Sequence, residues 1–489
     1  MTLALSRRRI LAAAGSLASL LPFAAGRAGA AAPAGPIALA VRRRTIAVHG
    51  KPASVFGIAQ PDGTTGLFLD PGQRFDVTLR NEAGEPTIIH WHGQTPPPDQ
   101  DGVTEFGIPP LAADTARAYD FAPRPGTHWM HSHYGLQEQM LMAAPLIVRT
   151  AEDLRADEQE VSVLLHDFTF RDPAELLAGL RDGTGQHGGM AMGGVTHGAA
   201  VAPHSGMAVP GMRHGNIAAM DLNEVDYDAY LANDRALDDP LVVRTERGGR
   251  VRLRLINGAT ATAFWIDLGD ADATLRSVDG NPVRPLSGRR FPLAPGQRLD
   301  LVLRVPAGRV VPVLAQREGD RQRTGLVLAA PGAPVRRIAQ VAPFSAGPID
   351  LSLEQRLIPL EPLRPRAVDT ALRVTLTGSM SPYVWTIDDR AWGEPRALQV
   401  RKSQRVALEM VNRSPMAHPM HLHGHHFQVV ALNGRKLAGA MRDTVLVPVG
   451  GSVTIAFDAD NPGRWLLHCH NLLHMAAGMM TELAYHDAA

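Results

Sequence analysis

The sequence predicts an all-β protein made of three β-sandwich units. Short segments in which apolar and polar residues alternate recur along the chain between Gly and Pro residues, and this pattern is typical of sandwich strands. Residues 74–80 and 298–304 show it most clearly, each beginning in a Pro-Gly-Gln-Arg turn. The length of 489 residues fits about three domains at roughly 150 residues each.

The composition narrows the class of protein. Hydrophobic residues make up 45% of the chain and charged residues 20%, which is typical of a folded globular protein. The net charge of +1 argues against nucleic-acid binding through bulk charge, since neutralising phosphates needs a basic excess. Outside the N-terminus, no apolar run reaches the roughly 18 residues of a membrane span. We expect a monomer.

The N-terminus predicts export. Residues 1–30 contain the paired Arg7 and Arg8, the apolar run 11–25 and a small-residue segment ending at Ala30, which is the order of a cleavable signal peptide. The paired arginines resemble the twin-arginine export motif, which a receptor reads as an address. We therefore expect a periplasmic protein that the twin-arginine pathway exports.

Three units follow this signal peptide. We expect them at 37–150, 158–335 and 348–489, with an Ala-, Pro- and Gly-rich linker between the last two. Residues 173–181 are among the few that look helical. The first and third units share a repeat, in which a His-x-His pair begins six residues after the proline of a Pro-Gly pair. The middle unit lacks the His-x-His pairs, so we expect it to be a structural spacer.

Four His-x-His pairs indicate a metal cluster. Alternate strand residues face the same side, so both imidazoles of a pair point the same way. The pairs are His90/His92, His131/His133, His421/His423 and His468/His470. Cys469, the single cysteine, points to the opposite face, where His418, His474 and Met479 complete the ligand set of a blue-copper electron-transfer site. Zinc could occupy parts of this set, but zinc has no redox use for it.

These motifs resemble those of the multicopper oxidases over essentially the whole mature chain. The four blocks read His90-Trp-His-Gly, His131-Ser-His-Tyr-Gly, His418-Pro-Met-His-Leu-His-Gly and His468-Cys-His-Asn-Leu-Leu-His-Met-Ala-Ala-Gly-Met. The resemblance implies three cupredoxin-like Greek-key domains and four copper ions. It also implies that one-electron oxidation of a substrate at a type 1 copper is coupled to the reduction of dioxygen to water at a trinuclear cluster.

The resemblance further implies the ligands of each copper. Type 1 copper would take His418, Cys469, His474 and Met479; type 2 would take His90 and His421; the type 3 pair would take His92, His131 and His470, and His133, His423 and His468. Asp101 matches a family acid that assists proton delivery, although an Asp-Gly turn residue is the alternative. A second acid often follows the last type 1 histidine, but Met475 stands there in this chain.

A Met- and His-rich insert bears on the substrate. Residues 186–215 hold eight such side chains: His187, Met190, Met192, His197, His204, Met207, Met212 and His214. Thioethers are soft ligands suited to Cu(I), and similar segments occur in copper-resistance and copper-efflux oxidases. We therefore expect oxidation of Cu(I) to Cu(II) and a role in copper tolerance. The alternatives are a laccase-like oxidase of phenols or aromatic amines, and a copper-sequestering protein.

Overall fold

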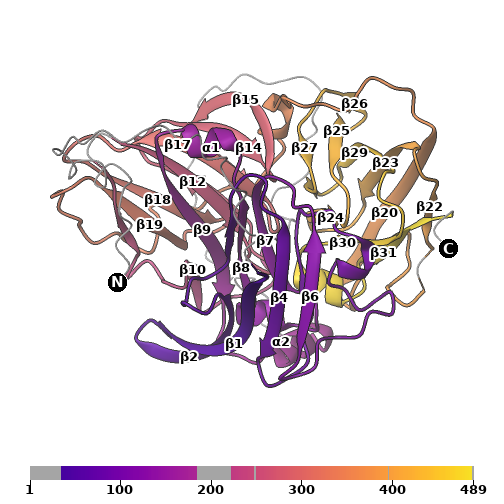
Figure 1. Ribbon diagram of the computed structural model, residues 1–489. Coiled ribbons are helices and arrows are strands. Elements are labelled where there is room, and N and C mark those ends of the chain that lie inside the picture. The colour runs from indigo at the N-terminus through magenta and orange to yellow at the C-terminus, as the bar shows by residue number, and fades with distance from the viewer. Residues whose placement is uncertain (1–34, 184–221, 247–248, 395, 487–489) are drawn as a thin grey trace, which may run out of the picture. The chain divides into compact units, whose positions relative to one another are not determined.

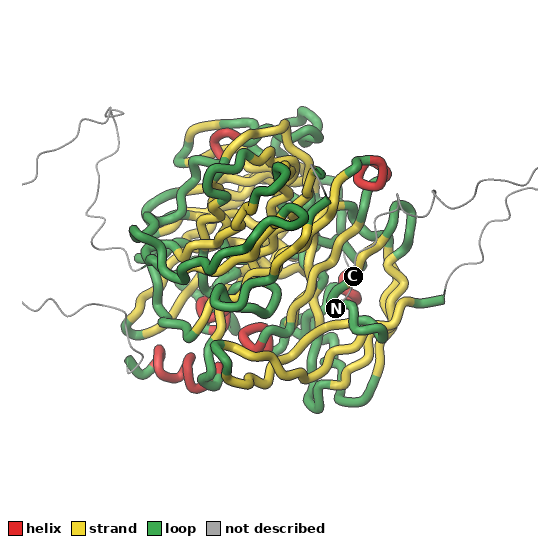
Figure 2. Tube along the Cα trace, turned by 90° about the vertical axis from the view of Figure 1, so that its left-hand side faces the viewer, coloured by secondary structure: helices red, strands yellow, loops and turns green. Residues whose placement is uncertain are grey.

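Six β-sheets dominate the part of the chain that the structure describes. The computed structural model describes residues 35–183, 222–246, 249–394 and 396–486, and all the strands lie in the unit formed by residues 37–489. Figure 1 shows the strands in chain order, and Figure 2 shows how few helices accompany them. The predicted all-β class is confirmed. The predicted signal peptide and the insert 186–215 lie outside the described residues.

The first group of strands forms two four-stranded sheets, with the orders β2-β1-β4-β6 and β3-β8-β7-β5. Its elements are β1 (Ile37–Val48), β2 (Lys51–Ala59), β3 (Leu67–Leu69), β4 (Phe75–Glu82), β5 (Ile89–His90), β6 (Ala116–Phe121), β7 (Gly126–Ser132) and β8 (Ala143–Val148). The alternation that predicted a strand over 74–80 buries Phe75, Val77 and Leu79 of β4 in the core.

The second group forms a six-stranded sheet, β10-β9-β12-β17-β14-β15, and a five-stranded sheet, β11-β19-β18-β13-β16. Its strands are β9 (Glu158–Phe168), β10 (Ala229–Ala232), β11 (Val242–Arg244), β12 (Arg250–Asn257), β13 (Phe264–Asp267), β14 (Ala273–Val278), β15 (Asn281–Gly288), β16 (Arg290–Leu293), β17 (Arg298–Arg304), β18 (Val310–Arg317) and β19 (Arg323–Ala329). The strand predicted over 298–304 is β17. Both β12 and β17 contact β7, so the first two groups pack directly on each other.

Among the described residues of this part of the chain, two short α-helices are present. Helix α1 covers Ala151–Arg155, and α2 covers Pro173–Arg181, the stretch predicted to be helical. The Asp172 side chain caps α2 by accepting hydrogen bonds from the backbone N–H groups of Ala174 and Glu175. No helix among the described residues is long and apolar enough to cross a bilayer.

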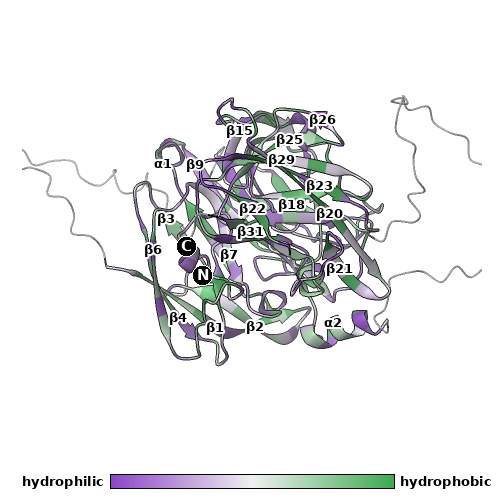
Figure 3. Ribbon diagram, turned by 90° about the vertical axis from the view of Figure 1, so that its right-hand side faces the viewer, coloured by the Kyte–Doolittle hydropathy of each residue, from purple (hydrophilic) through white to green (hydrophobic). Residues whose placement is uncertain are grey.

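The third group forms a seven-stranded sheet, β21-β20-β23-β29-β25-β26 with β27 beside β25, and a five-stranded sheet, β22-β31-β30-β24-β28. Its elements are β20 (Thr370–Met380), β21 (Tyr383–Ile387), β22 (Leu398–Val400), β23 (Arg405–Asn412), β24 (His418–Leu422), β25 (Phe427–Leu432), β26 (Arg435–Lys436), β27 (Met441–Arg442), β28 (Thr444–Val447), β29 (Ser452–Asp458), β30 (Arg464–Cys469), α3 (Leu472–Ala476) and β31 (Met480–Tyr485). Figure 3 shows apolar residues along β23 and β29. One hydrophobic cluster joins this group to the second.

Candidate metal centres

The histidines of the four His-x-His pairs meet at one buried site. Strands β5 and β7 pair His90 with His131, and strands β24 and β30 pair His421 with His468. Three sets of three residues each bring their ligand nitrogens within 4.8 Å of one another: His90, His92 and His421; His92, His131 and His470; His133, His423 and His468. The last two sets are those predicted for the two type 3 coppers. We call this site the eight-histidine site.

Many ring nitrogens at this site lack a partner. The buried nitrogen atoms without a hydrogen-bond partner among the described residues are His90 Nε2, His92 Nδ1, His131 Nε2, His133 Nδ1 and Nε2, His421 Nε2 and His470 Nε2. Leaving one buried polar atom unpaired costs about 1–3 kcal/mol. So many unpaired nitrogens facing one site therefore indicate that the site is built to hold a cation.

Burial keeps most of these histidines in their neutral form. Burial, followed by the charge of neighbouring histidines, lowers the pKa of His131, His421, His423 and His470 well below the ordinary value. Burial, followed by the positive charge of Arg298, does the same to the pKa of His92. Burial also lowers the pKa of two further rings at this site, His133 and His468, to about 3. Neutral imidazole is the form that binds metal ions, so the rings need not lose a proton before they bind one.

Carboxylates hold the outer nitrogens of several rings. Asp101, which follows the short helix η2 (Pro98–Gln100), lies with Oδ2 2.8 Å from His423 Nδ1, and its carbonyl oxygen lies 2.9 Å from His90 Nδ1. Glu138 Oε2 lies 2.8 Å from His131 Nδ1. Such partners orient a ligating ring and decide which nitrogen carries the proton. The predicted Asp101 is thus next to the site and is buried, unlike an ordinary turn residue.

A second site surrounds Cys469. Its Sγ lies 3.6 Å from His418 Nδ1 and 3.7 Å from His474 Nδ1, and the two Nδ1 atoms are 3.1 Å apart. Met479 is fully buried beside them: its N–H donates to the carbonyl of His474, and its carbonyl accepts from the N–H of Cys469. All four residues predicted for type 1 copper are therefore together.

Cys469 is buried, and a few polar side chains contact the two histidines beside it. Burial raises the pKa of the Cys469 thiol, so the metal-free protein keeps a neutral thiol there. Ser414 Oγ lies 2.5 Å from His418 Nε2, and Glu224 Oε2 lies 3.4 Å from His474 Nε2. The ring of Trp385, itself buried, lies 4.1 Å from the ring of His474, centroid to centroid, and covers it.

A cavity of about 490 Å³ is lined by His133 of the eight-histidine site and by residues 475–478, which follow His474 of the Cys469 site. Its wall also includes Glu105 and Met480. Burial raises the pKa of the Glu105 carboxyl, whose Oε1 lies 3.8 Å from His133 Nδ1. The cavity therefore contains a carboxyl group of the first strand group, near the position where Met475 replaces the acid expected from the resemblance.

The family profiles and known proteins that match this sequence include copper enzymes and copper-resistance proteins. Multicopper oxidase family profiles match residues 40–153, 205–312 and 365–489. The multicopper oxidase MmcO of Mycobacterium tuberculosis is 32% identical, over 85% of this chain and 80% of its own length. The chain belongs to the multicopper oxidase family. Copper resistance protein A of Pseudomonas syringae pv. tomato is 24% identical, over 92% of this chain and 90% of the relative.

Solved structures of multicopper oxidases have the same fold. The laccase of Botrytis aclada superposes with a TM-score of 0.72 at 21% identity, covering 91% of this chain and 87% of the laccase. The cupredoxin-like fold expected from the sequence is confirmed. The donor set of this multicopper oxidase also fits copper, because a thiolate and a thioether are soft ligands and imidazole suits copper equally.

Several residues at the two sites of this multicopper oxidase lie outside the motifs that predicted the ligands. Glu138, Glu224, Arg298 and Asp443 lie in no histidine block. Glu224 and Arg298 belong to the middle part of the chain, which therefore contributes to both sites beyond the spacer role expected from its sequence. Their spacing follows no period, so a search for charged residues beside the ligands in the folded chain is the only route to them.

Proposed function

We propose that this multicopper oxidase oxidises Cu(I) to Cu(II), reduces dioxygen to water and serves copper tolerance. The observation that carries the proposal concerns the residues on either side of the Met- and His-rich segment. Arg181, at the end of α2, donates from Nη2 to the carbonyl of Ala476 at 3.0 Å. Glu224, which follows the segment, lies 3.4 Å from His474 Nε2. The chain therefore enters and leaves this segment beside the Cys469 site.

This arrangement favours a soft cation as the substrate. We propose that substrate Cu(I) binds to His187, Met190, Met192, His197, His204, Met207, Met212 and His214 before it transfers its electron. The described residues that flank this segment, Arg181 and Glu224, contact residues of the loop and ligand set around Cys469. Thioethers and imidazoles together prefer Cu(I) over hard cations such as Mg²⁺ or Ca²⁺.

We further propose the assignment of four copper ions. Type 1 copper takes His418, Cys469, His474 and Met479; type 2 takes His90 and His421; the type 3 coppers take His92, His131 and His470, and His133, His423 and His468. Support comes from the grouping of these side chains and from the unpaired nitrogens at the eight-histidine site. Bound there, copper would supply one-electron oxidation at the Cys469 site and four-electron reduction of dioxygen at the other.

The chain's own residues prepare both sites for this chemistry. Cys469 is peptide-bonded to His468 and His470, so strand β30 links the two sites covalently. Trp385 excludes water from the ring of His474. Asp101 accepts from His423 Nδ1 through Oδ2, while its Oδ1 has no hydrogen-bond partner among the described residues. We propose that this oxygen of Asp101, which lies 3.3 Å from His90 Nδ1, passes protons to the eight-histidine site.

Location and domain division are also proposals. We propose that residues 1–30 direct twin-arginine export to the periplasm, on the evidence of Arg7 and Arg8 in the sequence. We propose domain boundaries at 37–150, 158–335 and 348–489, in keeping with the three groups of strands. A comparison of the N-terminal residue and cellular fraction of the wild type with an Arg7→Lys, Arg8→Lys variant tests the export route; equal processing of both would contradict it.

A laccase-like activity toward phenols or aromatic amines is the second candidate. The observation that favours it is the cavity of about 490 Å³ next to the loop that follows His474. This volume accommodates a small aromatic ring. Because Leu136, Leu177 and Trp392 line it, an apolar ring would find apolar partners there.

Oxygen uptake by the copper-loaded protein decides between the two substrates. We expect faster uptake with Cu(I) than with a simple phenol under the same conditions. A variant in which a short Gly-Ser linker replaces 186–215 should lose Cu(I) oxidation and keep or gain phenol oxidation. A full-length control with Met190, Met192, Met207 and Met212 changed to Leu separates loss of ligands from loss of chain. An unchanged Cu(I) rate in both variants would remove the segment from the mechanism, and a preference for phenol would make the enzyme a laccase.

A further inference from the structure

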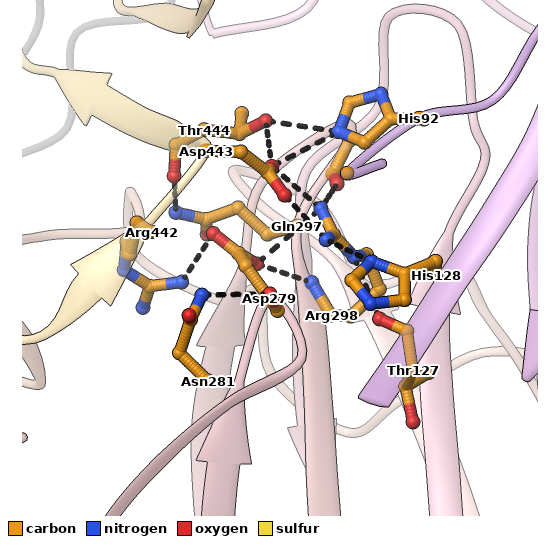
Figure 4. Close-up of polar contacts among 12 residues, drawn as sticks. His92, Thr127, His128, Asp279, Asn281, Gln297, Arg298, Arg442, Asp443 and Thr444 are labelled. Carbon is orange, nitrogen blue, oxygen red and sulfur yellow. Dashed lines mark hydrogen bonds and ion pairs between the residues drawn. The ribbon is translucent and has the colours of Figure 1, made fainter. Parts of the chain in front are cut away.

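A buried ion pair from the second and third strand groups reaches the eight-histidine site (Figure 4). Arg298, the first residue of β17, is fully buried. Its guanidinium donates from Nη1 to Asp443 Oδ1 at 2.7 Å and from Nη2 to Asp443 Oδ2 at 2.5 Å. This two-pronged pairing is the geometry in which arginine fixes both the position and the plane of a carboxylate.

Asp443, held in this way by Arg298, contacts two histidines of the eight-histidine site. Its Oδ1 lies 3.1 Å from His92 Nε2, and its backbone carbonyl lies 2.8 Å from His421 Nδ1. Thr444 Oγ1 lies 3.2 Å from each of the same two nitrogens. Asp443, in the third strand group, therefore holds the imidazole of His92 from the first group and that of His421 from the third group.

The contacts decide which nitrogen each ring offers. His92 donates its Nε2–H to Asp443, which leaves Nδ1 facing the site without a partner. His421 donates its Nδ1–H to the carbonyl, which leaves Nε2 free. The two rings stack, with centroids 3.8 Å apart and planes 14° from parallel. A rotation of Asp443 would therefore disturb both rings together.

Other contacts hold Arg298 itself in place. Its Nε donates to the carbonyl of Thr127 at 3.1 Å, and Nη1 donates to the carbonyl of Gly296 at 3.0 Å. The space beside the pair is filled so closely that a Cβ on Gly93 would lie 2.5 Å from Arg298 Nη2 and 2.9 Å from Asp443 Oδ2. The guanidinium therefore has one available position, and a shorter or rotated cation cannot reproduce it.

We propose that Arg298 is a positioning residue, which acts through Asp443 to hold His92 and His421 in the orientation that copper binding requires. The inference rests on the proposed copper ligands and not on the identity of the substrate. It assigns the middle part of the chain a direct task at the eight-histidine site. A lysine at this position keeps the charge but loses the fork, so the role depends on geometry more than on charge.

The test measures copper affinity site by site in the full chain. We prepare Arg298→Lys and Asp443→Asn and titrate copper out of each with a chelator. The type 2 electron paramagnetic resonance signal reports the eight-histidine site, and blue absorbance reports the Cys469 site. Loss of an outer partner typically weakens metal binding about 10- to 100-fold, so we expect that loss at the eight-histidine site, an altered type 2 line shape, and unchanged blue absorbance.

Arg254→Lys is the matched control. Arg254 is as deeply buried as Arg298 and donates to Asp300 Oδ2 at 2.9 Å. Its ion-pair partners Asp153, Glu160 and Asp300 form no hydrogen bond or ion pair with a predicted copper ligand among the described residues, whereas Asp443 contacts His92 and His421. We expect this variant to keep the wild-type type 2 signal. Wild-type affinity and line shape in Arg298→Lys and in Asp443→Asn would overturn the inference, as would an equal loss in Arg254→Lys. A wild-type protein without any type 2 signal would instead refute the proposed ligands.

Discussion

Gly102 offers a stringent test of how the backbone supports the eight-histidine site. It follows Asp101, is buried, and has a φ of +85°, a conformation that side chains rarely adopt. A Cβ at this position would overlap the carbonyl oxygen of Ile89 and lie 2.5 Å from its carbon and 2.9 Å from His90 Cα. All three atoms belong to the backbone, so no rotation of a side chain can relieve the overlap.

Gly107 serves as the control, because a substitution there introduces the backbone strain without the overlap. Its φ is +86°, but no atom lies within 4 Å of the place where its Cβ would be. Gly107→Ala should therefore cost only the left-handed strain, about 1 kcal/mol. Gly102→Ala carries the same strain and must also displace strand β5 or Asp101, for which we expect a total cost of about 3–5 kcal/mol.

The two variants are compared by urea unfolding and by copper content. Gly102→Ala should unfold at a lower urea concentration than Gly107→Ala, because only Gly102→Ala displaces backbone. It should also bind less copper at the eight-histidine site, since Asp101 contacts His90 and His423. Blue absorbance from the Cys469 site should persist. Equal free energies of unfolding for the two variants would refute the reasoning from backbone overlap.

Two further predictions concern single side chains. Cys469→Ser should abolish the blue colour and turnover while circular dichroism keeps the wild-type β spectrum, because the thiolate is the proposed electron entry and serine fills nearly the same space; retained oxidase activity would contradict the type 1 assignment. Burial raises the pKa of Glu318 from 4.5 to about 7. Between these two pH values the folded state holds a proton that the unfolded state releases. The contribution of Glu318 to the free energy of unfolding therefore falls as the pH rises from about 4.5 through 7. Glu318→Gln, which keeps the acceptor for the N–H of Ile349, should therefore gain stability over the wild type by at most about 3 kcal/mol between pH 5 and pH 8; a difference that does not vary with pH would refute the shift.

Local patterns in the sequence account for much of the fold and of the ligand set. The side chains of a strand alternate by local geometry, so the pattern at 298–304 predicts β17 without knowledge of its neighbours. The same alternation makes each His-x-His pair point one way and Cys469 the other. Cys469, His474 and Met479 lie in one short segment of sequence, 469–479, so these residues can be grouped from the sequence.

Only the tertiary structure decided which carboxylates and cations support those ligands. Asp443 meets Arg298 across 145 positions of sequence, and Glu224 meets Asn471 across 247. Such contacts depend on how the strand groups pack, because a buried charge needs a partner but chain spacing does not say which one. The sequence by itself determined the class, the family and the grouping of the histidines and Cys469, since these follow from local spacing. The orientation of the ligand rings follows instead from distant residues that only packing brings together.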